Sequence, residues 1–426
     1  MSGVSWYEAA AYAEYAGKQL PTVRHWYAAA QLDSATWFLP ASNFSGTGLA
    51  RVGEYRGEGP FGTYDMAGNV KEWCWNESTV GKLTIVGGAW SESSYMFSEP
   101  DARSPFDRSP VNGFRCVRYS SPPPATWLTA IHPVTRDFTK EKPASDEVFE
   151  AYRALYNYDR SELKASVDHV DDSSPYWRRE RITYTAPYGS GARVPALLFL
   201  PKSAQPPYQT IVYYPGAGAR AFVSSAETEK LEGWARLEVL LRAGRAVMYP
   251  VYQRTYERGA AARQSASAET LLERRNWLVQ QIQDMRRAVD YLETRPDIAS
   301  DRLAFFGVSF GGGRGPVAVA LETRFKVAVF ADGGLPLLLS LSEADPLHFA
   351  PRVRVPVLML NGKHDYLYPV QTSQLPLLRI LGTREQDKKH VLFEAAHEVV
   401  AVRTQVIREM LDWLDRYIGP VRRKEP

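Results

Sequence analysis

Short and almost continuously apolar segments recur in the chain from residue 210 onward, and they restrict the possible folds more than any other feature. A strand with apolar side chains on both faces has to be covered on both faces, as parallel strands are when helices pack above and below the sheet. Between these segments, Asn276–Glu293 and Val402–Ile418 carry apolar residues at helical spacing. We therefore predict an α/β fold with a doubly wound, mostly parallel sheet. The predicted strands are TIVYYP (210–215), AVMYPV (246–251), RLAFFG (302–307), VAVFAD (327–332), PVLMLN (356–361) and HVLFEA (390–395).

Two further elements are predicted ahead of these strands. Glu147–Asn157 has the pattern of a helix. Arg181–Thr185 and Val194–Leu200 are strand-like, and Gly189-Ser190-Gly191 between them can form the turn of a hairpin.

The chain changes character near residue 120. Before this point it is rich in Trp, Tyr, Gly and Ser, and it has one clear helix signal, in which Ser5 and Glu8 form a capping box and Gly17 ends the helix. Three consecutive prolines, Pro122–Pro124, favour extended polyproline II and interrupt both helix and sheet. The predicted parts are a small domain at 1–120, a Pro-rich linker at 121–145 and the α/β domain at 146–426.

The pentapeptide GVSFG at 307–311 places Ser309 between a predicted strand and Gly315–Leu321, which can be helical. A nucleophile on a sharp strand-to-helix turn needs this setting, because the turn lifts the hydroxyl above the edge of the sheet. Glycine at 307 and 311 leaves room for a close backbone crossing. We predict that Ser309 is a nucleophile.

A serine hydroxyl needs a histidine base, and the base needs a carboxylate that orients it. In this kind of sheet both follow the nucleophile along the chain, on loops at the carboxyl ends of strands. Asp365 follows PVLMLN and His397 follows the last strand, so we favour this pair. Asp332, after VAVFA, is the rival acid, and His348 is the spare histidine.

Two backbone N–H groups are predicted to stabilise a developing oxyanion. One belongs to Phe310, the residue after the nucleophile. The other belongs to Ala217, in the small-residue loop Pro215–Gly218 that follows the first strand.

Composition excludes several classes of protein. A net charge of +3 is too small to indicate a nucleic-acid partner. No run of eighteen apolar residues occurs, so we expect no membrane span, and the N-terminus lacks the pattern of a secretory signal. We expect a soluble, cytoplasmic protein. Two cysteines, Cys74 and Cys116, cannot build a disulfide framework or a cysteine-based zinc site, and buried thiols are expected.

Together, GVSFG, Asp365 and His397 resemble the α/β-hydrolase superfamily, in particular its serine esterase and dienelactone-hydrolase-like branches, over about 146–420. The resemblance implies hydrolysis of a small-molecule carboxylic ester through an acyl-enzyme on Ser309, without a cofactor. Pro215 stands where many relatives have a histidine before the glycines. The alternatives are a peptidase or amidase on the same triad and a catalytically inactive binding or scaffold protein. A loop at 253–275 with several arginines could favour a polar or anionic acyl group, or could simply be solvated.

The N-terminal part resembles the formylglycine-generating (sulfatase-modifying) enzyme domain, which has a C-type-lectin-like α+β fold. The match begins midway through that domain, so we expect 1–125 not to fold alone. The family's reactive cysteine pair follows the Gly-Gly-x-Trp element, but Val86–Ser104 has no cysteine, so the domain is expected to be non-catalytic. The resemblance also implies a bacterial source and a calcium site, here sparse, at Asp65, Glu72 and the carbonyls of Gly68 and Val70. The motifs are GVSW (3–6), KQLPT (18–22), YDMAGNVKEW (64–73), GGAW (87–90) and GFRC (113–116).

Overall fold

The computed structural model describes residues 1–44, 47–78, 80–92, 94–131, 136–189, 191–261, 269–397 and 399–424. The chain divides into two compact units. The first comprises Met1–Thr135, Gly362–Val370 and Phe393–Ala401. The second comprises Arg136–Asn361, Gln371–Leu392 and Val402–Pro426.

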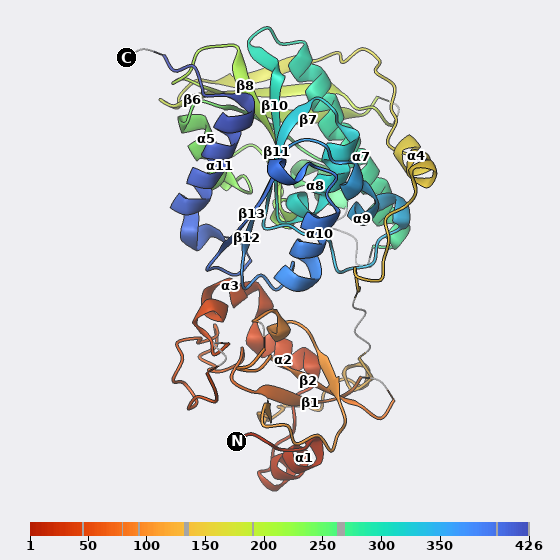
Figure 1. Ribbon diagram of the computed structural model, residues 1–426, viewed down its shortest axis with the longest axis vertical. Helices are drawn as coiled ribbons and strands as arrows, with labels where there is room; N and C mark the ends of the chain where they lie inside the picture. Colours follow the sequence, from red (N-terminus) through yellow and green to blue (C-terminus); the bar gives the residue numbers. More distant parts are fainter. Residues whose placement is uncertain are drawn as a thin grey trace. The chain divides into compact units, whose positions relative to one another are not determined.

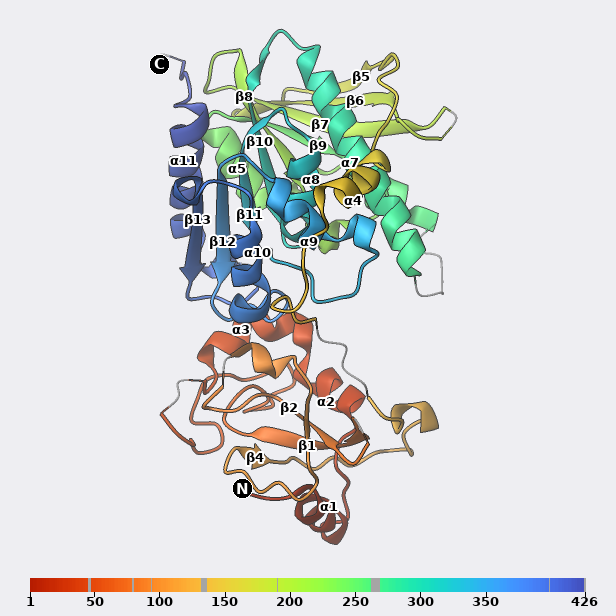
Figure 2. The same cartoon turned by 45° about the vertical axis from the view of Figure 1, so that its right-hand side comes forward.

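A nine-stranded sheet forms the centre of the described part of the second unit (Figures 1 and 2). Its strands are β5 (Ser166–Asp171), β6 (Trp177–Thr185), β7 (Arg193–Pro201), β8 (Tyr208–Tyr214), β9 (Ala246–Pro250), β10 (Ile298–Val308), β11 (Phe325–Ala331), β12 (Val357–Gly362) and β13 (Lys388–Phe393). Their order across the sheet is β13-β12-β11-β10-β8-β9-β7-β6-β5. The neighbours from β12 to β9 pair in parallel, whereas β9, β7, β6 and β5 pair antiparallel. The predicted strands and hairpin are present, although Ser190 of the hairpin turn lies outside the described residues.

Helices cover both faces of this sheet (Figures 1 and 2). On one face lie α7 (Leu271–Glu293) and α8 (Phe310–Leu321), and on the other lie α5 (Trp234–Arg242) and α11 (Arg403–Ile418). The shorter helices α4 (Asp146–Ala154), α9 (Pro346–Phe349) and α10 (Leu375–Ile380) complete the unit. The predicted class, a doubly wound α/β fold, is confirmed.

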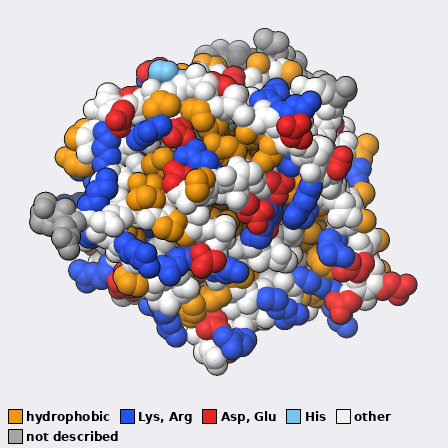
Figure 3. Space-filling view, turned by 90° about the horizontal axis from the view of Figure 1, so that it is seen from above, with side chains coloured by type: hydrophobic (Ala, Val, Ile, Leu, Met, Phe, Trp, Pro, Cys, Tyr) orange, Lys and Arg blue, Asp and Glu red, His pale blue; other side chains and the backbone are white. Residues whose placement is uncertain are grey.

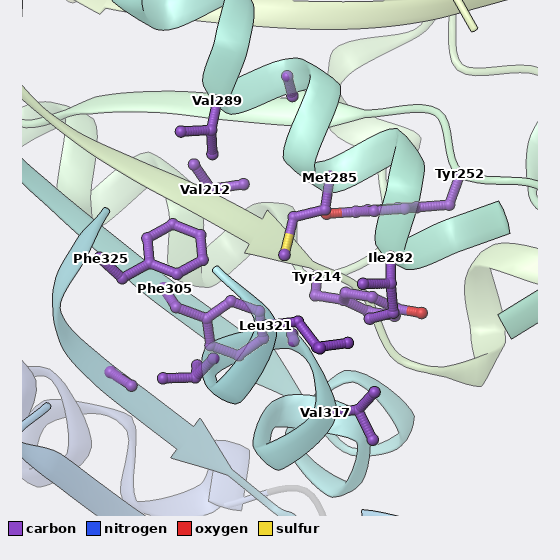
Figure 4. Close-up of a cluster of buried hydrophobic side chains, with 14 of the residues drawn as sticks. Val212, Tyr214, Tyr252, Ile282, Met285, Val289, Phe305, Val317, Leu321 and Phe325 are labelled. Carbon is purple, nitrogen blue, oxygen red and sulfur yellow. The ribbon is translucent and has the colours of Figure 1, made fainter. Parts of the chain in front are cut away.

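The main core lies between the sheet and the helices α7 and α8, which cover one face of the sheet (Figure 4). Val212 and Tyr214 of β8 point into it, while Ile211 and Tyr213 are buried on the opposite side of the same strand. Burial on both faces is the reason that these strands read as continuous apolar runs. Each such side chain contributes about 1.5–3 kcal/mol by leaving water. The apolar residues at helical spacing within the predicted helix 276–293 are buried, as core-facing positions are expected to be: Leu278, Ile282, Met285, Val289 and Leu292.

The described part of the first unit contains a four-stranded sheet and three short α-helices. The helices are α1 (Trp6–Tyr15), α2 (Val23–Ala30) and α3 (Ala35–Phe38). The strands are β1 (Lys71–Glu77), β2 (Leu83–Val86), β3 (Asp101–Arg103) and β4 (Asn112–Gly113), in the order β3-β2-β1-β4. The predicted capping box at α1 is formed, because Ser5 and Glu8 each accept the other's backbone N–H.

The core of the first unit includes residues from distant parts of the sequence. Trp26, Phe38 and Phe97 of the N-terminal region pack in one buried cluster with Tyr366 and Ala396. Tyr366 is 7% exposed to solvent and Ala396 is 1% exposed, so both belong to the interior of this unit. The N-terminal region therefore shares its core with two segments that leave the carboxyl ends of β12 and β13.

Charges of both signs are mixed on one face of the molecule. Lys and Arg side chains are interspersed with Asp and Glu on the face drawn in Figure 3. No helix among the described residues is both long enough and apolar enough to cross a bilayer.

Residues 1–125 expressed alone should not unfold cooperatively, because the segment lacks Tyr366 and Ala396 and exposes the apolar surfaces that they cover. We expect differential scanning calorimetry to show no sharp transition for this segment, while the full chain gives one. A sharp transition for 1–125 would contradict this prediction.

Candidate active site

Ser309 lies on a strained turn between β10 and α8. Its φ and ψ angles are 51° and −111°, a conformation that non-glycine residues rarely adopt. The turn is held on both sides: the Ser309 N–H donates to the carbonyl of Ala331, and the Ser309 carbonyl accepts from the Gly313 N–H, both at 2.8 Å. Strain of this kind persists only where the surrounding structure enforces it, and it is typical of nucleophile turns.

Two glycines make this turn possible. A Cβ at Gly311 would lie 2.2 Å from the carbonyl oxygen of Tyr214, and a Cβ at Gly307 would lie 2.4 Å from the carbonyl oxygen of Gly311. Backbone atoms cannot yield to such contacts as a flexible side chain can. The predicted close crossing of strand and helix is therefore present, and it requires glycine at both positions.

The loop after β8 lies beside Ser309. A Cβ at Gly216 would be 3.5 Å from the Ser309 Cβ. The loop is fixed by Glu232, whose Oε2 accepts the Gly216 N–H and the Tyr213 hydroxyl, each at 2.9 Å. Sequence reasoning missed Glu232, because no motif or spacing links it to the glycines.

The two proposed oxyanion donors begin helical segments. Phe310 is the first residue of α8, and Ala217 is the first residue of the 3-10 helix Ala217–Arg220. The first N–H groups of a helix have no acceptor within it. Both groups therefore have the backbone chemistry of an oxyanion donor, and their role stays a prediction.

Asp365 and His397 lie on two loops that belong to the first unit, residues 362–370 and 393–401. We call these segments the acid–base loops. The Nδ1 atom of His397 is 2.9 Å from Oδ2 of Asp365. An ionised carboxylate only accepts hydrogen bonds, so Nδ1 carries the proton and Nε2 is the basic nitrogen of the neutral ring.

The Asp365 carboxylate is completely buried and fixed in orientation. Its Oδ1 accepts the backbone N–H groups of Leu367 and Tyr368, each at 2.9 Å, while Oδ2 faces His397. Buried charge is tolerated only when it is paired and hydrogen-bonded, and here both oxygens have partners. Asp365 can therefore orient an imidazole without moving.

Asp332, the other candidate for the orienting carboxylate, is surrounded by different residues. It follows β11 and is also completely buried, but its Oδ2 is 3.0 Å from Nη2 of Arg236. The carboxylate favoured from the sequence, Asp365, is the one that bonds to His397 Nδ1. The catalytic roles of these residues stay predictions.

Three other histidines of the C-terminal domain, His348, His390 and His364, lie in different surroundings from His397. His348 Nδ1 accepts the Ala144 N–H at 3.0 Å, and burial lowers the pKa of this histidine. Burial lowers the pKa of His390 to about 4, so its ring is neutral at ordinary pH. His364 contacts Ser94 and Glu394.

Two arginines of the stretch 253–275, Arg254 and Arg258, take part in internal ion pairs. Arg254 lies 2.9 Å from Glu269, and Arg258 lies 2.6 Å from the buried Asp284. Arg263 lies outside the described residues. These pairs give Arg254 and Arg258 a structural use that the sequence reading did not anticipate.

The two carboxylates suggested for calcium, Asp65 and Glu72, have hydrogen-bond partners within the protein. Glu72 is engaged by the Arg115 guanidinium and accepts the Trp26 indole N–H at 2.7 Å, and Asp65 accepts the Gly53 N–H. No group of three or more His, Cys, Asp or Glu residues in the described ranges could hold a metal ion.

Both cysteines are free thiols. Cys74 is buried as predicted, whereas Cys116 is only half-buried. Burial raises the pKa of each thiol, which disfavours the reactive thiolate.

The strand order, the parallel centre of the sheet and the sharp serine turn between β10 and α8 define an α/β-hydrolase fold. Family comparisons agree with this assignment. Residues 237–402 match the dienelactone hydrolase family, and residues 1–120 match the sulfatase-modifying factor enzyme 1-like domain. The chain therefore combines an N-terminal domain of the second family with a C-terminal domain of the first.

Several known proteins are similar to parts of the chain. The acetyl xylan esterase from Paenibacillus sp. R4 is 18% identical, with 66% of this chain and 98% of that chain covered and a TM-score of 0.49. A putative dienelactone hydrolase from Klebsiella pneumoniae is 20% identical, with coverages of 56% and 99% and a TM-score of 0.43. Over 80 residues the chain is 42% identical to the serine/threonine-protein kinase pkn1 of Chlamydia pneumoniae, a match that covers 17% of this chain and 13% of that kinase.

Substituting Gly311→Ala should destabilise the protein by roughly 1–3 kcal/mol or more, because the added methyl group collides with backbone oxygen. The matched control is Gly218→Ala, whose Cβ would meet only a Glu232 side-chain carbon at 3.5 Å. Chemical denaturation of both variants measures the difference. Equal stabilities would show that the crossing is less tight than described.

Proposed function

We propose that the C-terminal domain is a serine hydrolase that cleaves carboxylic esters through an acyl-enzyme. Ser309 is the nucleophile, His397 the base and Asp365 the orienting carboxylate, with the N–H groups of Phe310 and Ala217 as oxyanion donors. The observation that carries the proposal is the strained, glycine-enforced conformation of Ser309 between β10 and α8. Backbone strain of this kind is concentrated at functional sites, because the surrounding structure has to maintain it.

The proposed reaction has two stages. Ser309 Oγ attacks the ester carbonyl carbon while its proton passes to His397 Nε2, and the carbonyl oxygen becomes an oxyanion that the two N–H groups stabilise. The intermediate then collapses, the bond to the alcohol breaks, and the imidazolium returns the proton to the leaving alkoxide. Water, activated by the same histidine, hydrolyses the acyl-enzyme and releases the acid.

The contacts of Asp365 support its proposed role as the orienting carboxylate. The Asp365 carboxylate holds His397 in the tautomer with Nδ1 protonated and stabilises the imidazolium that forms during each proton transfer. The family match also supports an ester substrate, because a lactone is a cyclic ester.

Substituting Ser309→Ala should lower the turnover of short p-nitrophenyl esters by at least about 1000-fold, because the nucleophile is removed. The melting temperature should be unchanged, and Ser203→Ala, at an exposed serine of the same unit, should retain full activity. Comparable turnover in Ser309→Ala would rule out the assignment. A wild-type protein that cleaves peptide amides faster than esters would be a peptidase or amidase.

The substitutions Asp365→Asn and Asp332→Asn should have different effects, the first mainly on activity and the second mainly on stability. Asp365→Asn should lower kcat about 100- to 10,000-fold, because the tautomer and the imidazolium lose their support. Asp332→Asn should chiefly lower stability, by about 3–5 kcal/mol, because it removes the buried carboxylate that pairs with the Arg236 guanidinium at 3.0 Å. Steady-state kinetics and denaturation of both variants separate the two roles, and a reversed pattern would assign the acid to Asp332.

A further inference from the structure

The acid–base loops are joined to each other through their backbones. The Lys363 N–H donates to the Phe393 carbonyl and the His364 N–H donates to the Ala395 carbonyl, each at 2.9 Å. A Cβ at Gly362 would lie 2.1 Å from a carbonyl oxygen of the second loop, so only glycine permits this approach. Movement of one loop is therefore coupled to movement of the other.

A chain of hydrogen bonds links both loops to the N-terminal domain. Ser94, a buried residue of that domain, has its Oγ 2.7 Å from His364 Nδ1, and His364 Nε2 is 2.6 Å from Glu394 Oε1. Lys363 Nζ lies 2.7 Å from the other oxygen of Glu394. Hydrogen bonds from Lys363 and, to a smaller extent, from His364 lower the pKa of the Glu394 carboxyl. Glu394 is therefore ionised and accepts both hydrogen bonds. When His364 Nε2 donates to Glu394, Nδ1 of the neutral ring is an acceptor for the Ser94 hydroxyl.

Apolar packing reinforces these hydrogen bonds. Tyr366, on the first loop, is buried among Trp26, Phe97 and other residues of the N-terminal domain, and its carbonyl accepts the Ser98 hydroxyl at 3.2 Å. The Tyr366 ring also lies edge-on to His397, with 6.2 Å between ring centroids. Tyr366 thus contacts both the N-terminal core and the imidazole.

We propose that the N-terminal domain positions the acid–base pair of the hydrolase, with Ser94 acting through His364 and Glu394 as a positioning residue. This inference rests on the proposed function of Ser309, His397 and Asp365. Ser94 and Ser98 lie within Val86–Ser104, the segment that lacks the cysteines expected from the family resemblance. That segment therefore has a structural task toward the loops that carry Asp365 and His397.

The test uses the full-length chain with the variants Ser94→Ala, Ser94→Thr and Glu394→Gln, and with Ser121→Ala as the control at an exposed serine of the same unit. We expect Ser94→Ala to lower kcat for a p-nitrophenyl ester about tenfold with KM unchanged. Ser94→Thr keeps the hydroxyl and should restore most of the rate. The double variant Ser94→Ala with Glu394→Gln should lose less than the product of the two single losses, because both act in one chain of hydrogen bonds.

The pH profile separates positioning from general destabilisation. The Asp365 carboxylate favours the protonated form of the His397 imidazole. A looser contact between these two side chains therefore favours the neutral form of His397. The acidic limb of the kcat/KM profile should therefore move to lower pH in Ser94→Ala and stay in place in Ser94→Thr and Ser121→Ala. A loss of folded protein alone would lower the amplitude of the profile and the melting temperature without moving this limb.

Two failures can be told apart. A wild-type chain that neither hydrolyses esters nor reacts with a fluorophosphonate would overturn the proposed function, and the positioning role with it. An active wild-type chain whose Ser94→Ala variant keeps the same kcat and the same acidic limb would overturn the positioning role alone.

Discussion

The close crossing of β10 and α8 is the constraint on which the proposed catalytic site depends. Gly307 and Gly311 let the end of the strand and the start of the helix approach each other and β8 within distances that no side chain allows. This approach forces Ser309 into a positive φ and brings the loop at Gly216 beside it. The burial of the strands on both faces supplies the rigidity that maintains the strain.

The proposed catalytic residues are distributed over both compact units. Ser309 belongs to the second unit, whereas Asp365 and His397 belong to the first, together with the N-terminal domain. The apolar cluster around Tyr366 and the hydrogen bond from Ser94 explain this division in physical terms. Under our proposal, the N-terminal domain acts by fixing the loops that carry Asp365 and His397, although it lacks the cysteines expected from its family resemblance.

Local patterns in the sequence predicted most of the second unit. The strands β8 to β12 were recognisable because burial on both faces demands continuous apolar runs, and the turn at Ser309 because the glycines and the flanking elements lie next to it. The last strand, β13, was also recognised from its apolar residues, although it lies at the edge of the sheet and is only partly buried. The edge strand β5 was missed, because SVDHVD is polar and largely exposed and has no such pattern. The choice between Asp365 and Asp332 rested on strand order alone. The contacts that distinguish them, His397 Nδ1 beside Asp365 and Arg236 beside Asp332, are visible only in the structure.

Long-range contacts could not be predicted from local patterns. The hydrogen bond between Glu232 and Gly216 joins residues 16 positions apart in the sequence, and the one between Ser94 and His364 joins residues 270 positions apart. Neither residue lies in a motif, and a serine or a glutamate at an arbitrary position carries no signal of its partner. The sharing of a core between the N-terminal region and the acid–base loops is a tertiary property for the same reason.

The most direct test of the account is to map a covalent adduct by mass spectrometry after the full-length chain has reacted with a fluorophosphonate. The account predicts one modified residue, Ser309, on the peptide that spans the end of β10 and the start of α8. Modification of a different residue, or none under conditions where the chain is folded, would contradict the central claim.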